Sequence, residues 1–238
     1  MIPAILLAAA LLGPALRADT VAPRQIPSYS GNSIVNAADN QPGPLAPNTI
    51  ATMYGSGLAY ITRALSSSDL HGGLLPTVLP GTGVRIFVGG ISAGILYVSP
   101  NQINFLIPNI LIPGPSDVQL AIDGLAGPDI PIQLAASSPA FFQSDRQTII
   151  AAHADGSLLK ADAPGRSGEF IVLYATGLGP VVPPLSNLQI PITAARIKQF
   201  EDLKITLGGS PLDPGSVAYA GVSPGFAGLY QINLRLPD

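Results

Sequence analysis

Short runs of alternating apolar and polar residues, separated by Gly, Pro, Asn and Asp, fill the chain from about Ser33 onward. The clearest run covers residues 230–236, in which every second residue is apolar. Successive side chains of a strand point to opposite faces of a sheet, so this alternation places one face in a core and the other in water. Residues 102–107 and 118–122 alternate in the same way. The pattern predicts an all-β fold of short antiparallel strands.

Turn-forming residues punctuate these runs. Asp123-Gly124 and Asp155-Gly156 are dipeptides suited to tight turns with positive φ, and each lies between two strand-like runs. Residues 193–203 are an exception, because the spacing of Ala194, Ile197 and Leu203, with Phe200, predicts a short amphipathic helix there.

Four segments of the first half return in the same order in the second half. The matching pairs are residues 50–58 with 170–178, 87–90 with 206–209, 98–100 with 222–224, and 102–108 with 231–237. Their offsets lie between 119 and 129 residues, which is the size of a whole domain and much longer than the period of a solenoid repeat. We therefore predict a duplicated β unit.

The predicted architecture is two tandem immunoglobulin-like antiparallel β-sandwich domains, with one larger intertwined β unit as the alternative. Residues 19–32 are rich in Pro and Ser and form an extended lead-in. The first domain then covers residues 33–138 and the second covers residues 139–238. Pro139 stands directly before Ala140 and two phenylalanines, which favours a packed junction over a flexible tether.

Residues 1–18 have the pattern of a secretory signal peptide. An apolar run is followed by small residues near Ala18, and it is much shorter than the ~20 apolar residues that span a bilayer. The expected location is therefore the cell envelope, the outer surface or the extracellular space, with no transmembrane span in the mature chain. A buried N-terminal strand or helix is the alternative interpretation of this run.

Composition narrows the classes of function. The 238 residues are 47% hydrophobic and 11% charged, with 26 Gly and 25 Pro, which indicates a folded, turn-rich protein. The formal net charge of −3 and the absence of a basic run argue against nucleic acid as a partner. The chain has no cysteine, so disulfides, thiol catalysis and thiolate metal sites are excluded.

Two irregular stretches, residues 59–83 and 179–202, follow the matched segments at the same place in each half. Loops on a rigid scaffold are common sites of function, so they are the candidate binding loops. Their candidate contact residues are Tyr60, His71, Leu188 and Phe200.

Catalytic chemistry has little support in the sequence. Residues 90–94 match the G-x-S-x-G pattern around Ser92, but a strand-like run follows them where a nucleophile elbow needs a helix, so we predict a hairpin turn. His71 and His153 belong to different halves and share no motif, and Asp155 and Glu169 lack the spacing of a calcium loop. We expect no catalytic residue, no metal and no cofactor.

Seven ordered motifs resemble the Solibacter-type uncharacterised C-terminal domain, found in exported acidobacterial proteins. They are residues 33–38, 54–58, 75–79, 97–105, 138–142, 174–180 and 219–233. The resemblance covers residues 33–237 and implies export, but it supplies no activity and no catalytic residue.

The expected function is that of a non-enzymatic exported module with a binding or structural role, whose partner is a protein or glycan at the cell surface. Two alternatives stay open. One is a secreted hydrolase with a site borne on loops, and the other is a domain that anchors its protein to the envelope or accompanies its export.

Overall fold

The computed structural model describes residues 26–145 and 147–238. The described backbone is all β, and its helical segments are 3₁₀ turns of three residues each. The predicted all-β, antiparallel class is confirmed. No helix among these residues is long and apolar enough to cross a membrane. The predicted signal peptide (residues 1–18) and residues 19–25 of the lead-in lie outside the described residues.

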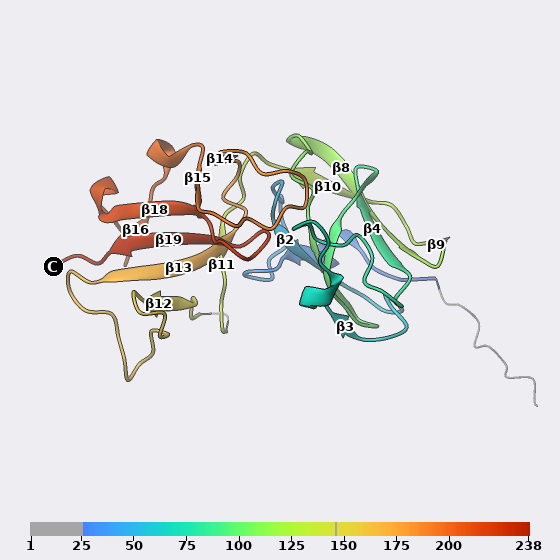
Figure 1. Ribbon diagram of the computed structural model, residues 1–238, viewed down its shortest axis with the longest axis horizontal. Coiled ribbons are helices and arrows are strands. Elements are labelled where there is room, and N and C mark those ends of the chain that lie inside the picture. The colour runs from blue at the N-terminus through green and yellow to red at the C-terminus, as the bar shows by residue number, and fades with distance from the viewer. Residues whose placement is uncertain (1–25, 146) are drawn as a thin grey trace, which may run out of the picture.

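The first half consists of two antiparallel sheets (Figure 1). The first sheet has the order β1-β2-β7-β6-β3, with bounds Ile34–Asn36, Ile50–Tyr54, Gln102–Leu106, Gly94–Val98 and Arg63–Ala64. The second sheet has the order β10-β8-β4-β5, with bounds Ile130–Leu134, Gly114–Ile122, Val84–Val88 and Ile91–Ser92, and β9 (Leu125–Ala126) pairs with β8. The 3₁₀ turns η1 (Gly31–Ser33) and η2 (Ser67–Asp69) complete this half.

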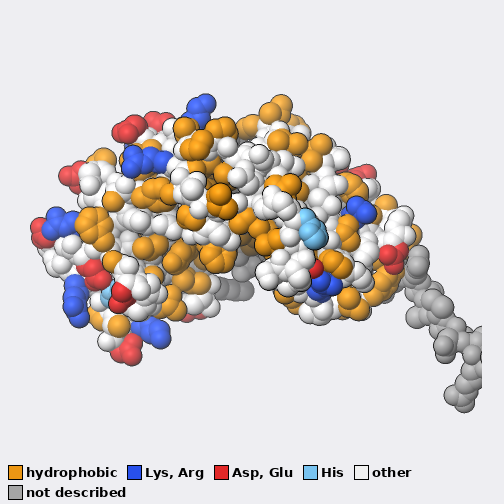
Figure 2. Space-filling model, in the orientation of Figure 1, with side chains coloured by type: hydrophobic (Ala, Val, Ile, Leu, Met, Phe, Trp, Pro, Cys, Tyr) orange, Lys and Arg blue, Asp and Glu red, His pale blue; other side chains and the backbone are white. Residues whose placement is uncertain are grey.

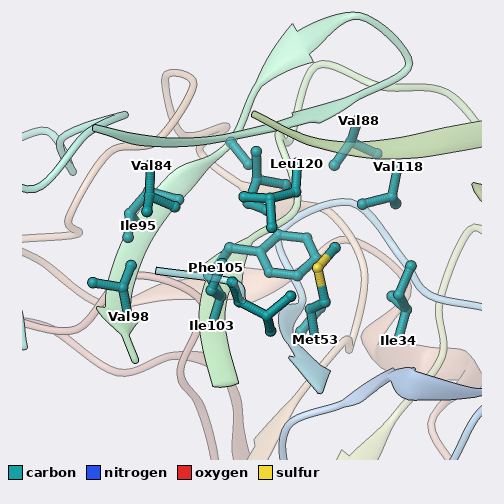
Figure 3. Packing of buried hydrophobic residues seen from close by; sticks show 14 of the residues in the cluster. Ile34, Met53, Val84, Val88, Ile95, Val98, Ile103, Phe105, Val118 and Leu120 are labelled. Atoms are coloured by element: carbon teal, nitrogen blue, oxygen red, sulfur yellow. The ribbon is translucent and has the colours of Figure 1, made fainter. Parts of the chain in front are cut away.

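The core of the first half lies between these two sheets. Figure 3 shows Phe105 of β7 surrounded by side chains of both sheets, among them Met53 of β2 and Leu120 of β8, and all three are fully buried. Burial alternates along β7 and β8 as their sequence patterns predict. The first half is therefore a β-sandwich stabilised by apolar burial between its layers.

The described end of the lead-in, residues 26–32, packs on this core through Tyr29. Tyr29 is 9% exposed. Its hydroxyl donates a hydrogen bond to the Pro128 carbonyl at 2.6 Å and accepts one from the Leu120 amide at 2.8 Å. Packing thus begins before Ser33, because a buried tyrosine hydroxyl finds its polar partners between β8 and the segment after β9.

The second half is built on one large antiparallel sheet (Figure 1). Its order is β11-β13-β19-β18-β15-β14, with bounds Ala140–Phe141, Phe170–Thr176, Tyr230–Arg235, Val217–Val222, Ala195–Ile197 and Val181–Val182, and β12 (Ala151–His153) also pairs with β13. A separate hairpin consists of β16 (Thr206–Leu207) and β17 (Ser210–Pro211), and the 3₁₀ turns are η3 (Phe200–Asp202) and η4 (Pro214–Ser216).

The matched segments occupy corresponding places in the two halves. Met53 pairs with Ile103 across β2 and β7, and Leu173 pairs with Ile232 across β13 and β19, at offsets of 120 and 129 residues. The other four pairs of β2 with β7 also have counterparts at these offsets in β13 and β19. The polar faces correspond as well. The Gln102 side chain donates a hydrogen bond to Asn104 at 2.9 Å, and the Gln231 side chain donates one to Asn233 at 3.2 Å.

The third matched strand has an irregularity at the same rung in both halves. The register shifts between Ile95 and Tyr97 in β6, and between Val217 and Tyr219 in β18. Tyr97 pairs with Asn104, and Tyr219 pairs with the corresponding Asn233. A β-bulge increases the local twist of a strand, so the two sheets bend at corresponding positions.

One sequence match does not correspond in the sheets. Val98 pairs with Ile103, whereas Val222 pairs with Tyr230, two rungs further toward the turn. The residue opposite Ile232, the counterpart of Ile103, is Ala220. The strand β18 is longer than β6, so the two Val-Ser-Pro segments follow their strands at different rungs of the two ladders.

The helix predicted for residues 193–203 is wrong. Ala195–Ile197 forms β15, which pairs with β18, and only Phe200–Asp202 forms a 3₁₀ turn. Ala195 and Ile197 are both buried while Arg196 between them is exposed, which is strand alternation. Helical spacing over so few residues was overridden by pairing with an available sheet edge.

Candidate functional site

The two long loops predicted as binding elements lie against each other. The amide of Leu75 donates to the carbonyl of Leu188 at 3.0 Å, and the amide of Ile190 donates to the carbonyl of Gly73 at 2.8 Å. The side chains of Leu75 and Leu188 are buried in one small cluster with Leu106. The structure thus brings residues 59–83 and 179–202 together as one surface at the junction of the two halves.

A groove opens beside this contact, and we call it the loop groove. It has a volume of about 410 Å³. It is lined by Ile50, Leu65, Ser66, Ser67, Leu70, Leu75, Leu96, Ile190, Gly225, Phe226, Ala227 and Leu229. Most of these side chains are aliphatic, and Phe226 is the aromatic among them, with 61% of its surface exposed. The chemistry of the groove suits apolar side chains of a ligand rather than a charged group.

Hydrophobic side chains are also common on the surface near the junction. On the face drawn in Figure 2 they gather over the middle of the molecule, where the two halves meet, while charged side chains lie mostly toward the end of the second half. Ile110 and Ile112, which follow β7, are 59% and 80% exposed. Exposed apolar surface of this kind is typical of a contact region.

The four predicted contact residues are separated by the fold. Tyr60 is 50% exposed and His71 is exposed, so both are accessible on the first loop. Leu188 is only 7% exposed and holds the two loops together, so it is a packing residue rather than a surface contact. Phe200 packs on the core of the second half, and the Arg196 guanidinium lies 4.2 Å from the centre of its ring. Leu70 and Ile190 line the groove and lie within the two predicted loops, although they were not among the four contact residues, and Phe226 lies outside both loops.

An ion pair shapes the first loop. Asp69 is 4% exposed, and its carboxylate lies 2.6 Å from the Arg63 guanidinium, which also donates to the Pro80 carbonyl at 2.6 Å. The amide and hydroxyl of Ser66 donate to the same carboxylate, both at 2.9 Å. The hydrogen bond from the Ser66 amide, with the nearby Arg63 charge, holds the pKa of Asp69 below its ordinary value. This network fixes the backbone that carries Ser66, Ser67 and Leu70 into the groove.

A second cavity lies at the junction, with a volume of about 220 Å³. It is lined mainly by prolines and aliphatic side chains, with Asn48, Asn109 and Tyr230 as its polar members. The Asn109 side chain donates to the carbonyls of Leu185 and Ser186 at 2.9 and 3.0 Å, while its Oδ1 has no hydrogen-bond partner. Each polar side chain that lines this cavity hydrogen-bonds to another segment of the chain. We therefore interpret the cavity as part of the packing between the halves rather than as a binding site.

Tyr230 is the central bridge of this junction. Its hydroxyl donates to the Gly179 carbonyl at 2.6 Å and accepts from Asn48 Nδ2 at 3.0 Å. Burial raises the pKa of Tyr230 to about 12, so the hydroxyl stays neutral. Nearby, Thr176 accepts a hydrogen bond from the Ile50 amide at 3.0 Å and donates to the Gly228 carbonyl at 2.7 Å. The Asn48–Tyr230 and Ile50–Thr176 hydrogen bonds thus join one half to the other through buried polar side chains of the second half.

His153 forms a pair that the sequence did not reveal. Its Nδ1 lies 2.5 Å from Glu169 Oε1, and its Nε2 lies 3.2 Å from the Ala163 carbonyl. The hydrogen bond to Glu169 raises the pKa of His153 and lowers that of Glu169. Both ring nitrogens are occupied by contacts within one loop, so the imidazole has no free nitrogen for a substrate proton. The pair joins the two ends of the segment that connects β12 to β13.

Ser92 lies in a hairpin, as predicted. Gly89 and Gly90 have φ of 54° and 73° and connect β4 to β5, and Ser92 pairs with Phe87. Two consecutive positive φ angles are the conformation of a two-residue hairpin turn. Ser92 is therefore a strand residue, without the strand-to-helix turn of a nucleophile elbow. Within residues 26–145 and 147–238, no group of three or more His, Asp or Glu side chains could hold a metal ion.

Comparison with protein-family models and with curated proteins gave no match for this chain. The family resemblance inferred from its motifs therefore stays a prediction.

Proposed function

We propose that this protein is an exported, non-enzymatic β-sandwich module that binds an apolar segment of a partner protein in its loop groove. The observation that supports it is the convergence of two separate loops, residues 59–83 and 179–202, on one apolar groove. The loops are fixed by buried contacts, so the groove is preformed. Binding therefore carries no free-energy cost for ordering the loops.

The architecture that we propose is two related immunoglobulin-like units in tandem. The matched strand registers and the two corresponding bulges support this relationship. The loop that follows β2 and the loop that follows β13 then leave equivalent corners of their units. Packing the units through Tyr230 and Thr176 places these corners together, which explains why a groove forms at the junction.

A protein partner fits this groove better than a glycan. Carbohydrate sites usually offer aromatic platforms and converging polar groups, whereas the groove has one aromatic side chain and two serines among aliphatic residues. The partner's contact segment should therefore be apolar. Export to the envelope follows from the signal-peptide pattern in residues 1–18 and is part of the proposal.

The test uses purified protein labelled with a fluorophore and added to intact cells of the source organism. We expect saturable binding that falls at least about tenfold in affinity in a Phe226→Ser, Leu70→Ser double variant, because both changes replace apolar contact surface. Leu158→Ser is the matched control, because Leu158 is 50% exposed and does not line the groove.

Equal binding by the groove variant and the control would reject the groove as the binding site. The non-enzymatic part has a separate test with a serine-directed fluorophosphonate probe. Covalent labelling of the native protein that disappears in Ser92→Ala would show a secreted hydrolase instead.

A further inference from the structure

The β16–β17 hairpin has the same backbone construction as the β4–β5 hairpin of the first half. The Ala93 amide donates to the Ile86 carbonyl at 2.9 Å, and the Leu212 amide donates to the Ile205 carbonyl at 2.8 Å, 119 residues later in both partners. The turn glycines correspond too, since Gly208 and Gly209 have φ of 58° and 83°. Residues 203–207 therefore occupy the position of Val84–Val88.

The two hairpins differ in what lies on their outer edge. In the first half β8 pairs with β4 along its whole length, with Leu120 opposite Ile86. In the described part of the second half, β16 pairs with β17 and with no other strand. Amide and carbonyl groups of alternate residues in a strand point to opposite edges, so those of Lys204 and Thr206 face the edge that β8 would occupy.

The burial of the side chains differs between the two hairpins in the same way. Val84, Ile86 and Val88 of β4 are fully buried on the inner face of the sheet that β8 completes. Their counterparts are less covered, because Leu203 and Ile205 are half-buried and Leu207 is 49% exposed. A cavity of about 220 Å³ opens there. Its lining residues are Pro139, Ala140, Phe141, Ala175, Leu178, Leu203, Lys204, Ile205, Thr206 and Ile232.

Only one edge of the hairpin is open to pairing. Pro211 lies on β17 opposite Thr206 and lacks an amide hydrogen, which blocks the outer edge of β17. The β16 edge has no proline, and its Lys204 corresponds to Arg85, which is exposed on β4 while β4 pairs with β8. A basic side chain at this position is therefore compatible with strand pairing.

We propose that the β16 edge binds an extended strand of a separate partner protein, antiparallel to residues 203–207, in the place that β8 takes in the first half. The first half defines the chemistry of this strand, because Val118, Leu120 and Ile122 of β8 point inward, with Gln119 and Ala121 between them. The partner strand has aliphatic side chains at alternate positions that fill the cavity, and its backbone bonds to Lys204 and Thr206. This surface shares no lining residue with the loop groove.

The experiment uses the whole protein and a synthetic peptide with capped ends and the sequence of residues 114–122. Binding is measured by isothermal calorimetry, and hydrogen exchange of the amides of Lys204 and Thr206 is measured by NMR. We expect binding that slows the exchange of both amides. A peptide of the same composition with the alternation destroyed should not bind. No binding of the native-sequence peptide, or binding without protection of these two amides, would overturn the proposal.

Two variants at one position separate the edge from the fold. Thr206→Pro removes the outward amide without touching the hairpin bond of Ile205, and we expect it to weaken peptide binding about tenfold or more. Thr206→Val keeps the amide and should bind as the native protein does. Equal binding by both variants would contradict the proposal.

The occupant is tested by sedimentation of the protein without peptide. We expect a monomer, and a dimer that Thr206→Pro dissociates would assign the edge to a second copy and overturn the proposal. The Phe226→Ser, Leu70→Ser variant should bind the peptide normally, so failure of the loop groove and failure of the strand edge are distinguished.

Discussion

Single polar residues at the junction stabilise this molecule through bonds that are both buried and satisfied. The Tyr230 hydroxyl is the clearest case, because it is fully buried and bonds to Gly179 on its own half and to Asn48 on the other. A buried polar group costs free energy when its partner is removed, so such residues affect stability more than their number indicates.

Tyr230→Phe removes the hydroxyl and leaves the Gly179 carbonyl and the Asn48 amide without it. We expect the free energy of unfolding to fall by about 1–3 kcal/mol. Urea denaturation followed by circular dichroism measures this change. Tyr60→Phe is the control, because Tyr60 is half exposed, and its effect should stay within about 0.5 kcal/mol. Equal midpoints for the two variants would contradict the assigned role of Tyr230.

The His153–Glu169 pair makes stability depend on pH. The pKa of His153 is raised above its ordinary value of 6.5, so its contribution is fully present below pH 6.5 and is lost as pH rises through the raised folded value. The pKa of Glu169 is lowered below 4.5, so its contribution is present above 4.5 and is lost as pH falls through the lowered value. The pair therefore stabilises the fold most between about pH 4.5 and 6.5.

The measurement is an NMR titration of the His153 ring. In Glu169→Gln we expect the pKa of His153 to fall toward its ordinary value, because the carboxylate is replaced by a neutral amide. Asp162→Asn is the control, because Asp162 is an acidic residue of the same loop, whereas the partners of the His153 ring are Glu169 and the Ala163 carbonyl. An unchanged His153 pKa in Glu169→Gln would show that the pair does not form in solution.

At the scale of elements, the paired strands β2–β7 and β13–β19 form the centres of the two halves. Their inward residues correspond rung by rung, but the cover above them differs. Met53 and Ile103 are fully buried between two sheets, whereas Leu173 and Ile232 are 6% and 3% exposed beneath loops and a two-stranded hairpin. Apolar burial at the centre of the second half is therefore less complete.

This difference predicts unequal costs for truncation. Met53→Ala and Leu173→Ala should both destabilise by about 2–5 kcal/mol, with Met53→Ala the larger, because a cavity closed on every side relaxes least. Chemical denaturation of the two variants gives the comparison. Ile192→Ala serves as the exposed control, since Ile192 is 83% exposed. A larger cost for Leu173→Ala would mean that the second core is as completely covered as the first.

At the scale of the whole molecule, the two halves are joined by close backbone packing. Gly228 has φ of 73°, and a methyl group there would overlap Cδ1 of Leu106 and come within 2.7 Å of Ile50 Cγ1, both from the first half. Leu106 is fully buried, so it has little room to move away. The halves thus depend on the absence of a side chain at this position.

Gly228→Ala should therefore destabilise the protein more than positive φ alone explains. Gly225→Ala is a matched control, because Gly225 has φ of 88° and nothing within 4 Å of the added methyl group. We expect Gly228→Ala to cost about 1–3 kcal/mol more than this control, from overpacking at the junction. Differential scanning calorimetry measures both variants, and similar melting temperatures would argue against the close contact of the halves.

Much of the fold was predictable from the sequence, whereas little of the site was. Strand alternation in residues 102–107 and 118–122 marked inward side chains correctly, because a strand repeats every two residues and its faces meet different solvents. The turn at Asp123-Gly124 followed from residue type, and both residues have positive φ. The helix expected near Phe200 failed, because strand pairing of Ala195 with Val222 involves a residue distant in sequence.

By itself the sequence determined the all-β class, the inward faces of the long strands and the places of the tight turns, because these depend on neighbouring residues. The tertiary structure decided which surfaces are shared. Leu75 meets Leu188, His153 meets Glu169, and the edge of β16 stays open among the described residues, although no local pattern marks any of these. The physical reason is that such contacts depend on how sheets stack and how the two halves meet, which joins residues far apart in the chain.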